Sequence, residues 1–493
     1  MRGLTRPLNT NLYSLIRETP SGENMIVIKF GGASLADLRN FQNVATFLKT
    51  CWFDQKKIIV VVSAMKDVTD SLMKAAFMAS SRKLDSWDEV LARIFDRHLE
   101  IASVLSKSSA KEKLLGDLED YQSELKSIFQ AVAALQECTP RALDFVLSFG
   151  ERLSSILLTA FLTENSLPAK QVSGEDLIIT DDQFGSAFPL EEITTRQIRE
   201  ILIPLLDMDQ LPVVSGFTGK TKAGQITTLG RGGTDFSASI IGSSLNAEEV
   251  WFMKEVDGIM STDPRVVSSA TTIPLMSYQE VAELSFFGAK VLHPIAIHPL
   301  KKHRIRARIK NVYKHDFCGT MVELAPSGHN PGPKAVTAIQ GVCMISVEGD
   351  GMIGIPGVAG RAFTSIADKG VNVLMISQTC SEQNICLAVK KEDQTKTIEA
   401  LSMEFELEIL KGHIDRVMAR DDVSIISLVG AGMSGVPGIA GKLFSIIGEN
   451  KINVLMIAQG SSEVNISFLL ENRELDAAIS CIHEGFELGC LNG

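Results

Sequence analysis

Hydrophobic and polar positions follow one another along most of this chain in blocks typical of an α/β protein. Residues 25–30 and 57–62 are short, almost continuous apolar runs, as expected for strands buried on both faces. Between them apolar residues recur every three or four positions, as on one buried face of a helix: Leu35, Leu38, Phe41, Val44 and Leu48. Residues 211–215 and 249–253 resemble the first two runs, and each is followed by glycine-containing turns. We therefore predict a mostly parallel sheet covered by helices on both faces.

Two stretches depart from this pattern. Residues 83–165 carry long helical periodicities with many charges and almost no glycine, so they form either a helical insertion or a helical side of the sheet. Residues 325–333 concentrate proline, glycine, serine and asparagine, a composition typical of a linker between domains.

Beyond the linker the sequence repeats itself. Residues 349–360 match residues 430–441, and residues 372–376 match residues 453–457, all at one offset of 81. Each copy is expected to run strand, glycine turn, helix, strand, strand, helix and a last strand, which is a ferredoxin-like plan. In the first copy we expect the first helix and the two strands after it at 358–369, 371–376 and 384–389.

The predicted organisation has five parts. They are an N-terminal extension, an α/β domain, a linker and two copies of one module: residues 1–24, 25–322, 323–337, 338–418 and 419–493.

Composition then excludes several classes of protein. Of the 493 residues, 45% are hydrophobic and 22% are charged, which can fill the cores of about three domains and excludes a disordered or fibrous chain. The net charge of −11 and the lack of any long basic block argue against a nucleic-acid partner, so we expect a small ligand. The longest apolar runs are far shorter than the roughly 20 residues of a membrane span, so we expect no membrane partner either.

The cysteines and the N-terminus bear on the cellular compartment. The eight cysteines contain no CxxC pair, and their scatter argues against a disulfide framework or a zinc site and favours buried thiols in a reducing compartment. Residues 1–24 hold three arginines and no acid before Glu18, which faintly resembles an organelle transit peptide. We favour a loose extension and a cytoplasmic protein.

Two glycine-containing turns have the chemistry of an anion site. The first, Lys29-Phe-Gly-Gly-Ala-Ser34, ends a strand and opens a helix, so backbone N–H groups, a helix N-terminus and the Lys29 ammonium can all face a phosphate. The second, Gly230-Arg-Gly-Gly-Thr-Asp235, combines a cation, a hydroxyl and a carboxylate ahead of a helix expected over 236–241. Each alone could be a tight turn or a helix cap. Together they favour a phosphoryl-transfer site, although neither is a Walker P-loop.

Other motifs carry weaker signals. Glu151 and Arg152 are adjacent in Phe149-Gly-Glu-Arg-Leu-Ser154, where the simplest explanation is a salt-bridged helix start. His293 and His298 lie five residues apart, a spacing that suits neither one helix face nor the HExxH zinc motif.

The repeat also contains the literal dinucleotide fingerprint GxGxxG, at 349–354 and again at 430–435. A nucleotide-binding unit of that type needs an acid at the end of the next strand to bind the ribose. The corresponding strands end in Ser377-Gln378 and Ala458-Gln459, so we do not expect NAD.

Six motifs, in order, resemble those of the aspartate kinases: KFGGAS at 29–34, VVSAM at 61–65, FGERLS at 149–154, GRGGTD at 230–235, VDGIMSTDPR at 256–265 and GAKVLHP at 288–294. The repeat resembles the two ACT regulatory modules of the same family, so the resemblance covers about residues 25–493. It implies the amino-acid-kinase fold followed by two ferredoxin-like ACT modules. It also implies transfer of the ATP γ-phosphoryl group to the β-carboxylate of L-aspartate, with ATP and Mg²⁺, as the first step of lysine, threonine and methionine biosynthesis.

The resemblance further implies residue roles. Lys29 would stabilise the transferring phosphoryl group, and Asp235 would orient Lys29. The nucleotide would be bound by a larger set: Gly31, Gly32, Ser34, Gly232, Gly233, Glu255, Met260, Arg265 and Lys290. An attacking carboxylate is already ionised at neutral pH, which agrees with the lack of a catalytic histidine motif.

Aspartate itself carries two carboxylates and an ammonium, so its site needs a cation and an anion. By resemblance, Arg231 would bind its α-carboxylate and Glu151 its ammonium, with Ser63 and Thr234 nearby.

This sequence departs from the family's pattern at three positions. Lys254-Glu255 replaces a Thr-Asp pair, Met260 replaces an aromatic residue, and Ala33 replaces a threonine. Lys254 changes the charge of the nucleoside-binding stretch. From the end of the chain at Gly493 we expect no homoserine dehydrogenase domain of the kind fused to some relatives.

Two alternative functions stay open. One is a catalytically weak amino-acid sensor whose kinase domain is degenerate, which the Lys254-Glu255 change favours. Four intact site residues oppose it: Lys29, Glu151, Arg231 and Asp235. The other is a kinase for a different acidic amino acid, which would share the phosphate turns but lack FGERLS and the tandem ACT pair.

For the regulatory modules we expect L-threonine rather than L-lysine as the effector. Gln378 and Gln459 occupy equivalent places after the central strands and resemble the threonine-inhibited members, with Asn372 and Asn453 as further candidates. A neutral amide can donate to a carboxylate or accept from a hydroxyl, whereas the lysine ammonium calls for an acid. Alternatively, both glutamines only cap strand ends. Because ACT modules usually pair their sheets, we expect a homodimer or a larger homo-oligomer.

Overall fold

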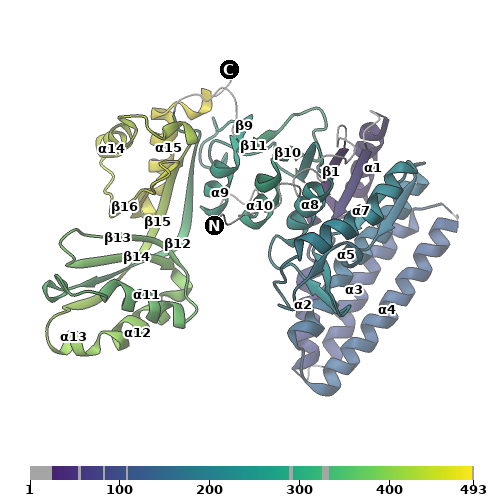
Figure 1. The fold of residues 1–493 in the computed structure, drawn as a ribbon, viewed down its shortest axis with the longest axis horizontal. Coiled ribbons are helices and arrows are strands. Elements are labelled where there is room, and N and C mark those ends of the chain that lie inside the picture. Colours follow the sequence, from purple (N-terminus) through teal and green to yellow (C-terminus); the bar gives the residue numbers. More distant parts are fainter. Residues whose placement is uncertain are drawn as a thin grey trace, which may run out of the picture. The chain divides into compact units, whose positions relative to one another are not determined.

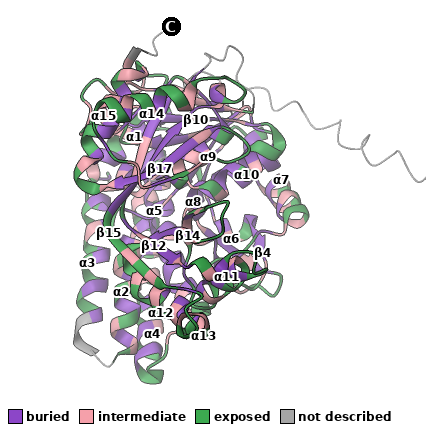
Figure 2. Ribbon diagram, turned by 90° about the vertical axis from the view of Figure 1, so that its left-hand side faces the viewer, coloured by how far each residue is buried: buried purple, intermediate pink, exposed green. Residues whose placement is uncertain are grey.

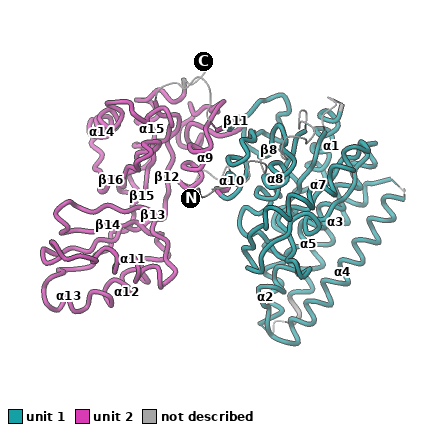
Figure 3. Tube along the Cα trace, in the orientation of Figure 1, with its two compact units in different colours: residues 1–257, 295–323 teal, residues 258–294, 324–493 magenta. Residues whose placement is uncertain are grey.

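The computed structural model describes residues 25–53, 57–81, 84–106, 109–287, 292–324 and 332–490, which form two compact units (Figure 3). The first unit holds the described residues up to Asp257 together with Ile295–Glu323, and the second holds the rest. The single α/β domain expected at 25–322 is therefore interrupted, because residues 258–294 belong to the second unit. This segment supplies Val266, Val267 and Phe287 to the apolar cores of that unit.

A mostly parallel sheet forms the centre of the first unit (Figure 1). The strands that the first unit contributes lie in the order β3-β5-β2-β1-β8-β10-β11; neighbours from β3 to β10 pair parallel, and β10 and β11 pair antiparallel. The strands predicted from apolar runs are confirmed as β1, β2, β5 and β8. The bounds are Met25–Phe30 (β1), Lys57–Val62 (β2), Ala169–Val172 (β3), Leu211–Ser215 (β5), Glu249–Lys254 (β8), Arg306–Asn311 (β10) and Thr320–Glu323 (β11).

Residues 83–165 combine both predicted alternatives. Helix α5 packs against the sheet, whereas α3 and α4 pack against α2 and α5 as a helical layer (Figure 1). Along α3 the buried positions recur every three or four residues, from Trp87 to Ile101, as the periodicity predicts (Figure 2). The helices of this unit are α1 (Leu38–Phe53), α2 (Val68–Ser80), α3 (Leu84–Ser103), α4 (Ser109–Leu135), α5 (Pro140–Glu164), α6 (Gly174–Leu177), α7 (Glu191–Asp207), α8 (Gly233–Ser244) and α10 (Pro294–His303).

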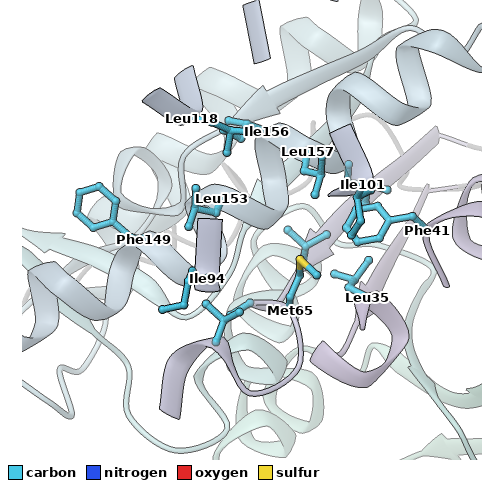
Figure 4. Packing of buried hydrophobic residues seen from close by; sticks show 14 of the residues in the cluster. Leu35, Phe41, Met65, Ile94, Ile101, Leu118, Phe149, Leu153, Ile156 and Leu157 are labelled. Atoms are coloured by element: carbon cyan, nitrogen blue, oxygen red, sulfur yellow. The ribbon is translucent and has the colours of Figure 1, made fainter. Parts of the chain in front are cut away.

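One apolar core joins the sheet to these helices. Figure 4 shows part of it, where Leu35 and Phe41 approach Met65 and the α5 side chain of Leu157. Among the described residues, α5 alone is long and apolar enough to cross a membrane. Because 83% of its apolar window is buried inside the fold, α5 is explained as the core helix of this unit.

A small second sheet lies beside the large one and consists of β4 (Ile179–Thr180), β6 (Thr218–Thr221) and β7 (Ile226–Thr228). The buried Asp144 of α5 fixes it, because its carboxylate accepts hydrogen bonds from the backbone N–H of Thr228 at 2.9 Å and of Gly185 at 2.8 Å. Burial raises the pKa of Asp144, although these bonds oppose the shift.

The second unit is built on a six-stranded antiparallel sheet with the order β13-β14-β12-β15-β17-β16. Its strands are β12 (Ala335–Glu348), β13 (Val373–Gln378), β14 (Asn384–Lys390), β15 (Arg416–Val429), β16 (Met456–Ala458) and β17 (Asn465–Glu471). Its main helices are α9 (Tyr278–Phe286), α11 (Val358–Asp368), α12 (Gln394–Glu404), α13 (Glu406–Leu410), α14 (Ile439–Glu449) and α15 (Leu475–Gly485). Both copies of the repeat thus have the predicted helix after the glycine turn.

The two copies share their central strands in an order that differs from the prediction. Strand β12 pairs with β15 along its whole length, through a bulge between Ile339 and Val342. The second half of β12 belongs to the first copy, beside β14. Its first half, from Ala335 to Ile339, pairs with the part of β15 whose other edge pairs with β17.

As a consequence, the last strand expected at the end of the second copy is absent from its described residues. After α15 the chain makes only a short 3₁₀ turn at Leu488–Cys490. The vacant position in the ferredoxin-like order is filled by residues 335–339, so the end of the stretch predicted as linker, 323–337, is strand. The apolar side chain of Val336 explains this, because it is 1% exposed and packs in the core of the second copy.

The GxGxxG motifs and the cysteines also differ from simple expectations. Each GxGxxG stretch forms a 3₁₀ turn in an antiparallel sheet, where β14 or β17 separates the strands on either side of it, and the helix begins only at Val358 or Ile439. A dinucleotide unit instead has parallel strands and a helix that starts at the glycines. The expectation of buried thiols is wrong for Cys318 and Cys380, which are exposed.

Candidate active site

The ends of the central strands of the first unit converge with the start of one helix. Lys29 lies next to the end of β1, which pairs in parallel with β2 on one side and β8 on the other. The strand that follows β1 in the chain, β2, lies on one side of it, whereas the later strands β8 and β10 lie on the other side. In open α/β sheets, ligands bind at the carboxyl ends of strands at such a switch point.

The first glycine turn follows β1 directly. Gly31 precedes a 3₁₀ turn over Gly32–Leu35, and a Cβ atom on Gly32 would lie 2.7 Å from the carbonyl oxygen of Ala64. Only glycine therefore lets this turn approach the end of β2. Ser34 is buried, and its hydroxyl donates to the Glu255 carboxylate at 3.3 Å.

The second glycine turn forms the start of α8. Gly232 caps the helix in the left-handed region, at a φ of 76°, without any side-chain cap bond. The helix begins at Gly233 rather than at the predicted 236, so Thr234 and Asp235 lie in its first turn. The N-terminal N–H groups and the Asp235 carboxylate are thereby brought to the edge of the sheet.

Asp235 lies between two lysines. Its Oδ1 is 2.6 Å from Nζ of Lys29, and its Oδ2 is 3.4 Å from Nζ of Lys254. Burial alone would raise the pKa of Asp235, but the two ammonium groups outweigh it and hold the pKa below its usual range. Burial lowers the pKa of Lys29, and the repulsion of Lys254 adds to this while Asp235 opposes it.

Glu151 lies in the middle of α5, so the predicted helix start at this motif is wrong. Burial raises its pKa to about 8. Hydrogen bonds from the backbone N–H groups of Ala64 and of Glu151 itself lower the pKa, as do the Lys29 charge and a hydrogen bond from the Ser63 hydroxyl, but they do not outweigh burial. Within the described part of the chain, its Oε2 is buried without a hydrogen-bond partner. A buried carboxylate oxygen of this kind is suited to an incoming ammonium group.

Arg152, the neighbour of Glu151, has a different role. Its guanidinium stacks 4.5 Å from the Tyr121 ring centre and 4.4 Å from that of Phe149, with Glu175 at 3.8 Å. It is therefore a packing residue of the helical layer rather than a partner of Glu151.

The remaining predicted aspartate-binding residues lie around the same edge. The Thr234 hydroxyl donates to Ser63 at 3.4 Å. Arg231 is exposed on the turn before α8, and no ion pair joins it to another described residue. The first unit thus brings together two glycine turns, a buried and a half-buried lysine, a buried pair of carboxyl groups and an exposed arginine. Such a set can bind a phosphoryl group beside an amino acid.

Three predicted nucleotide-binding residues are not brought to this cluster by the first unit. Met260 and Arg265 belong to the second unit, where Arg265 pairs with Asp263 at 2.6 Å. Lys290 lies outside the described residues.

In the second unit, Gln378 lies at the end of β13 and lines a cavity of about 410 Å³. The rest of the lining comes from the glycine turn and the start of α11, and from Glu382 and Ile385. Glu382 accepts a hydrogen bond from the backbone N–H of Gly354 at 2.9 Å. In the second copy Glu463 accepts from Gly435 at 2.6 Å, and Gln459 follows β16. Asn372 and Asn453 are exposed residues ahead of β13 and β16.

Two residues with evident chemistry were missed by sequence reasoning. Lys254 appeared only as a departure from a family pattern, because its proximity to Asp235 depends on the pairing of β8 with β1, which no local pattern encodes. Glu382 could have been noticed, since Glu463 repeats it at the offset of 81.

Comparison with known proteins gives a consistent picture. The chain matches the model of the amino acid kinase family over residues 24–311 and that of the ACT domain over residues 345–405 and 426–486. It is 33% identical over 477 residues to the chloroplastic bifunctional aspartokinase/homoserine dehydrogenase 1 of Zea mays, covering 96% of this chain but only 51% of that enzyme. The chain thus spans about half the length of these bifunctional relatives.

Shorter relatives are covered more completely. The chain is 30% identical to chloroplastic aspartokinase 1 of Arabidopsis thaliana over 465 residues, which is 93% of this chain and 80% of that enzyme. Its fold matches E. coli aspartokinase III in complex with aspartate and ADP with a TM-score of 0.76 at 25% identity, over 94% of this chain and all of that one. The same enzyme in complex with lysine and aspartate gives 0.77 at 26% identity, with coverages of 94% and 99%. The chain therefore belongs to the amino acid kinase family and, within it, to the aspartokinases.

Proposed function

We propose that this chain transfers the γ-phosphoryl group of ATP to the β-carboxylate of L-aspartate, giving 4-phospho-L-aspartate and ADP. The observation that carries the proposal is the cluster of Lys29, Asp235 and Lys254 at the sheet edge, with the buried Glu151 carboxyl beside it. By the same resemblance, the reaction would open the synthesis of lysine, threonine and methionine.

The reaction needs charge stabilisation more than proton transfer. A β-carboxylate oxygen attacks the γ-phosphorus, and the bond from that phosphorus to the β,γ-bridging oxygen breaks, with its electron pair left on ADP. No proton moves, since the attacking carboxylate is ionised at neutral pH. Lys29 would stabilise the negative charge of the transferring group, while Asp235 holds the lysine in position.

Aspartate would be bound by its fixed charges. Glu151 offers the unpartnered Oε2 to the substrate ammonium, and Arg231 offers an unpaired guanidinium, within the described residues, to the α-carboxylate. Ser63, whose hydroxyl bonds to Glu151, and Thr234, which donates to Ser63, would complete the pocket with hydroxyl groups.

The nucleotide phosphates would lie against the two glycine turns, at Gly31, Gly32 and Ser34 and at Gly232 and Gly233. Glu255, bonded to Ser34, would contribute to the same site. Met260, Arg265 and Lys290 remain nucleotide-site predictions from the family resemblance.

Mg²⁺ fits the site only as a companion of the nucleotide. The described residues contain no cluster of three or more histidine, cysteine or acidic side chains suited to a metal ion. Mg²⁺ in phosphoryl-transfer sites commonly keeps waters and phosphate oxygens as most of its ligands. Asp235 and Glu255 are the carboxylates that would lie nearest to it, and its chemistry would be to neutralise phosphate charge.

An amino-acid effector is proposed for the ACT modules, with threonine favoured over lysine. The cavity beside Gln378 is of a size suited to a small amino acid, and its amide can bind a carboxylate or a hydroxyl. Glu382 adds an acid to the same cavity, and it would suit the α-ammonium group that both candidate effectors carry. The preference for threonine therefore rests on Gln378 and the family resemblance.

Self-association is proposed as well. Ile376 and Ile457 occupy equivalent positions of the two copies and are 47% and 46% exposed. Two apolar side chains on such strands suit a homodimer or a larger homo-oligomer, which light scattering of the purified chain would reveal.

The reaction is tested by trapping its acyl phosphate. The purified chain is incubated with ATP, Mg²⁺ and hydroxylamine, and with L-aspartate, L-glutamate or N-acetylglutamate as acceptor. Hydroxamate formation is expected with L-aspartate alone, and Arg231→Ala is expected to raise KM for aspartate far more than KM for ATP. Preference for another acceptor, or no turnover with folded protein, would contradict the proposal and favour a different kinase or an amino-acid sensor.

A further inference from the structure

Lys254 is a half-buried cation of the cluster at the sheet edge, and the reaction proposed above assigns it no step. It is the last residue of β8, where its backbone is fixed by pairing with Asn311 and by a 2.8 Å hydrogen bond from the Val312 N–H to its carbonyl oxygen. Its side chain is 20% exposed and reaches Asp235, so it points along the edge where Lys29 also lies.

Both ammonium groups of this cluster face the same carboxylate. Each of the two Asp235 oxygens lies against a different lysine. Glu255, the nearest further carboxylate on this strand end, accepts a hydrogen bond from Ser34 and adds its negative charge to the same cluster. Within the described residues each of the two ammonium groups forms its ion pair with Asp235 alone, whereas an ammonium has three N–H donors. Both lysines therefore keep N–H donors for a ligand in a mostly buried place.

An anionic ligand can accept hydrogen bonds from these remaining donors. The start of α8 adds N–H groups that no side chain caps, and the first glycine turn adds more on the β1 side. Because Lys29 and Lys254 approach different oxygens of one carboxylate, they are separated enough to contact different oxygens of one phosphoryl group.

We propose that Lys254 is a second phosphate-binding cation of this site and contacts the terminal phosphoryl group of a bound nucleoside triphosphate. This inference rests on the proposed function for the identity of the ligand. It assigns the Lys254-Glu255 departure to substrate binding rather than to decay of the site. The competing explanation is that Lys254 is only a structural counter-ion of Asp235.

Direct nucleotide binding separates the two explanations. ATP and ADP are titrated separately into the full chain by calorimetry, with Mg²⁺ and without aspartate, so that no phosphoryl transfer is needed. Lys254→Gln is expected to weaken ATP binding roughly tenfold or more, as for a lost charge-assisted hydrogen bond, and ADP binding much less. Lys254→Arg is expected to restore most of the preference for ATP, since it keeps the charge.

Lys310→Gln is the matched control. Lys310 is another largely buried lysine, on the adjacent strand β10, where it lies 5.0 Å from the Trp251 ring centre and donates to the His315 carbonyl oxygen. It is expected to leave the ratio of ATP to ADP affinity unchanged. Thermal unfolding of each variant is followed by circular dichroism to check its fold. If Lys254→Gln does not fold, Lys254→Thr, which introduces the family's residue at this position, replaces it in the titrations.

Unchanged ATP affinity in Lys254→Gln, or an equal loss for ATP and ADP, would overturn the inference and leave a structural role. An ATP-selective loss in Lys310→Gln would overturn it as well. Failure of the proposed function is a separate result, because the wild-type chain would then bind ATP and yet form no aspartyl hydroxamate.

Discussion

Three ionisable side chains at the carboxyl edge of the large sheet have displaced pKa values, and burial is the largest influence on each, although the two lysines outweigh it at Asp235. The pairing of Lys29 with Asp235 favours the charged form of both groups. Glu151 has no such cation in contact, and its pKa rises to about 8. At this scale the site consists of the Lys29–Asp235 ion pair beside the Glu151 carboxyl group, which is suited to a positively charged ligand.

Lys29→Ala is expected to lower kcat by roughly 10²- to 10³-fold with little change in fold, because its charge acts mainly on the transition state. Steady-state kinetics of the hydroxamate assay measures this, and circular dichroism checks the fold. Wild-type turnover in the variant would refute the assignment.

The pH dependence of aspartate binding follows from Glu151. The free site holds a proton on Glu151 below pH 8, and this proton must leave before the carboxylate can pair with the substrate ammonium. KM for aspartate is therefore expected to fall as pH rises from 6 toward 8, by up to about tenfold per pH unit, while KM for ATP changes less. Glu151→Gln should abolish this slope, and an identical slope in that variant would exclude Glu151 as its source.

The same shift has a consequence for stability. Because the folded-state pKa lies above the unfolded value of 4.5, the folded chain keeps a proton that the unfolded chain releases between about pH 4.5 and 8. The Glu151 contribution to the free energy of unfolding is thus present below that range and is lost as pH rises through it.

The residues of the site could be predicted only in part from the sequence. Lys29, Glu151 and Asp235 lie in motifs that resemble a family, and the structure brings all three together. Lys254 could not be identified, since its partner lies 19 residues away on a helix and their contact depends on strand order. The start of α8 was also predicted three residues late. Glycines are usually signs of a turn, whereas here Gly232 adopts the left-handed conformation that precedes the helix and Gly233 is its first residue.

At the scale of elements, the β12 strand shows where local patterns cease to be informative. The sequence predicts the end of a linker followed by a strand in this stretch, yet the structure has one long strand that contributes one half to each copy. Alternation of apolar positions predicts that a strand forms, but the partner of each half depends on which core it fills. Val336 lies in the core of the second copy and Val347 in the core of the first.

Paired truncations on this strand test the shared arrangement. Val336→Ala is expected to destabilise the second copy by about 1–3 kcal/mol and to speed amide hydrogen exchange in β17 more than in β14. Val347→Ala should show the opposite preference. Equal effects of both variants on both strands would mean that the two copies unfold as one unit.

Glu280 joins α9 to the second copy. Its carboxylate is fully buried and accepts from the N–H of Ser277 at 2.6 Å and of Ala431 at 2.7 Å, with Lys334 at 3.1 Å. Breaking this buried network by Glu280→Ala is expected to lower the free energy of unfolding of the second unit by about 3–5 kcal/mol. Glu392→Ala, which removes an exposed ion pair to Lys390, should cost about 1 kcal/mol or less in the same urea titration. Similar costs for both variants would contradict the buried-network interpretation.

At the scale of the whole molecule, the chain passes between the two units three times: it enters the second unit at Gly258, returns to the first at Ile295 and leaves it again after Glu323. The fold class, the repeat and the family were predictable from periodicity and motifs. The three crossings were not, because residues 258–294 contain motifs of the family's kinase domain while their apolar side chains fill cores of the second unit.

Effector choice is predicted at this scale. L-threonine is expected to inhibit the hydroxamate reaction and L-lysine is not, with a coupling of about 1–3 kcal/mol between the effector and substrate sites. Gln378→Ala with Gln459→Ala should abolish the inhibition without changing uninhibited turnover. Inhibition by lysine, or undiminished inhibition by threonine in the double variant, would refute the assignment.

The shared β12 strand also limits how this chain can be dissected. A fragment that begins after Ile339 would contain all the stretches that match between the two repeat copies, yet it would leave residues 425–429 of β15 without their β12 neighbour. The exposed N–H and C=O groups of that strand would then pair with another molecule, so such fragments should aggregate. A fragment intended to hold both copies should therefore start upstream of Lys334.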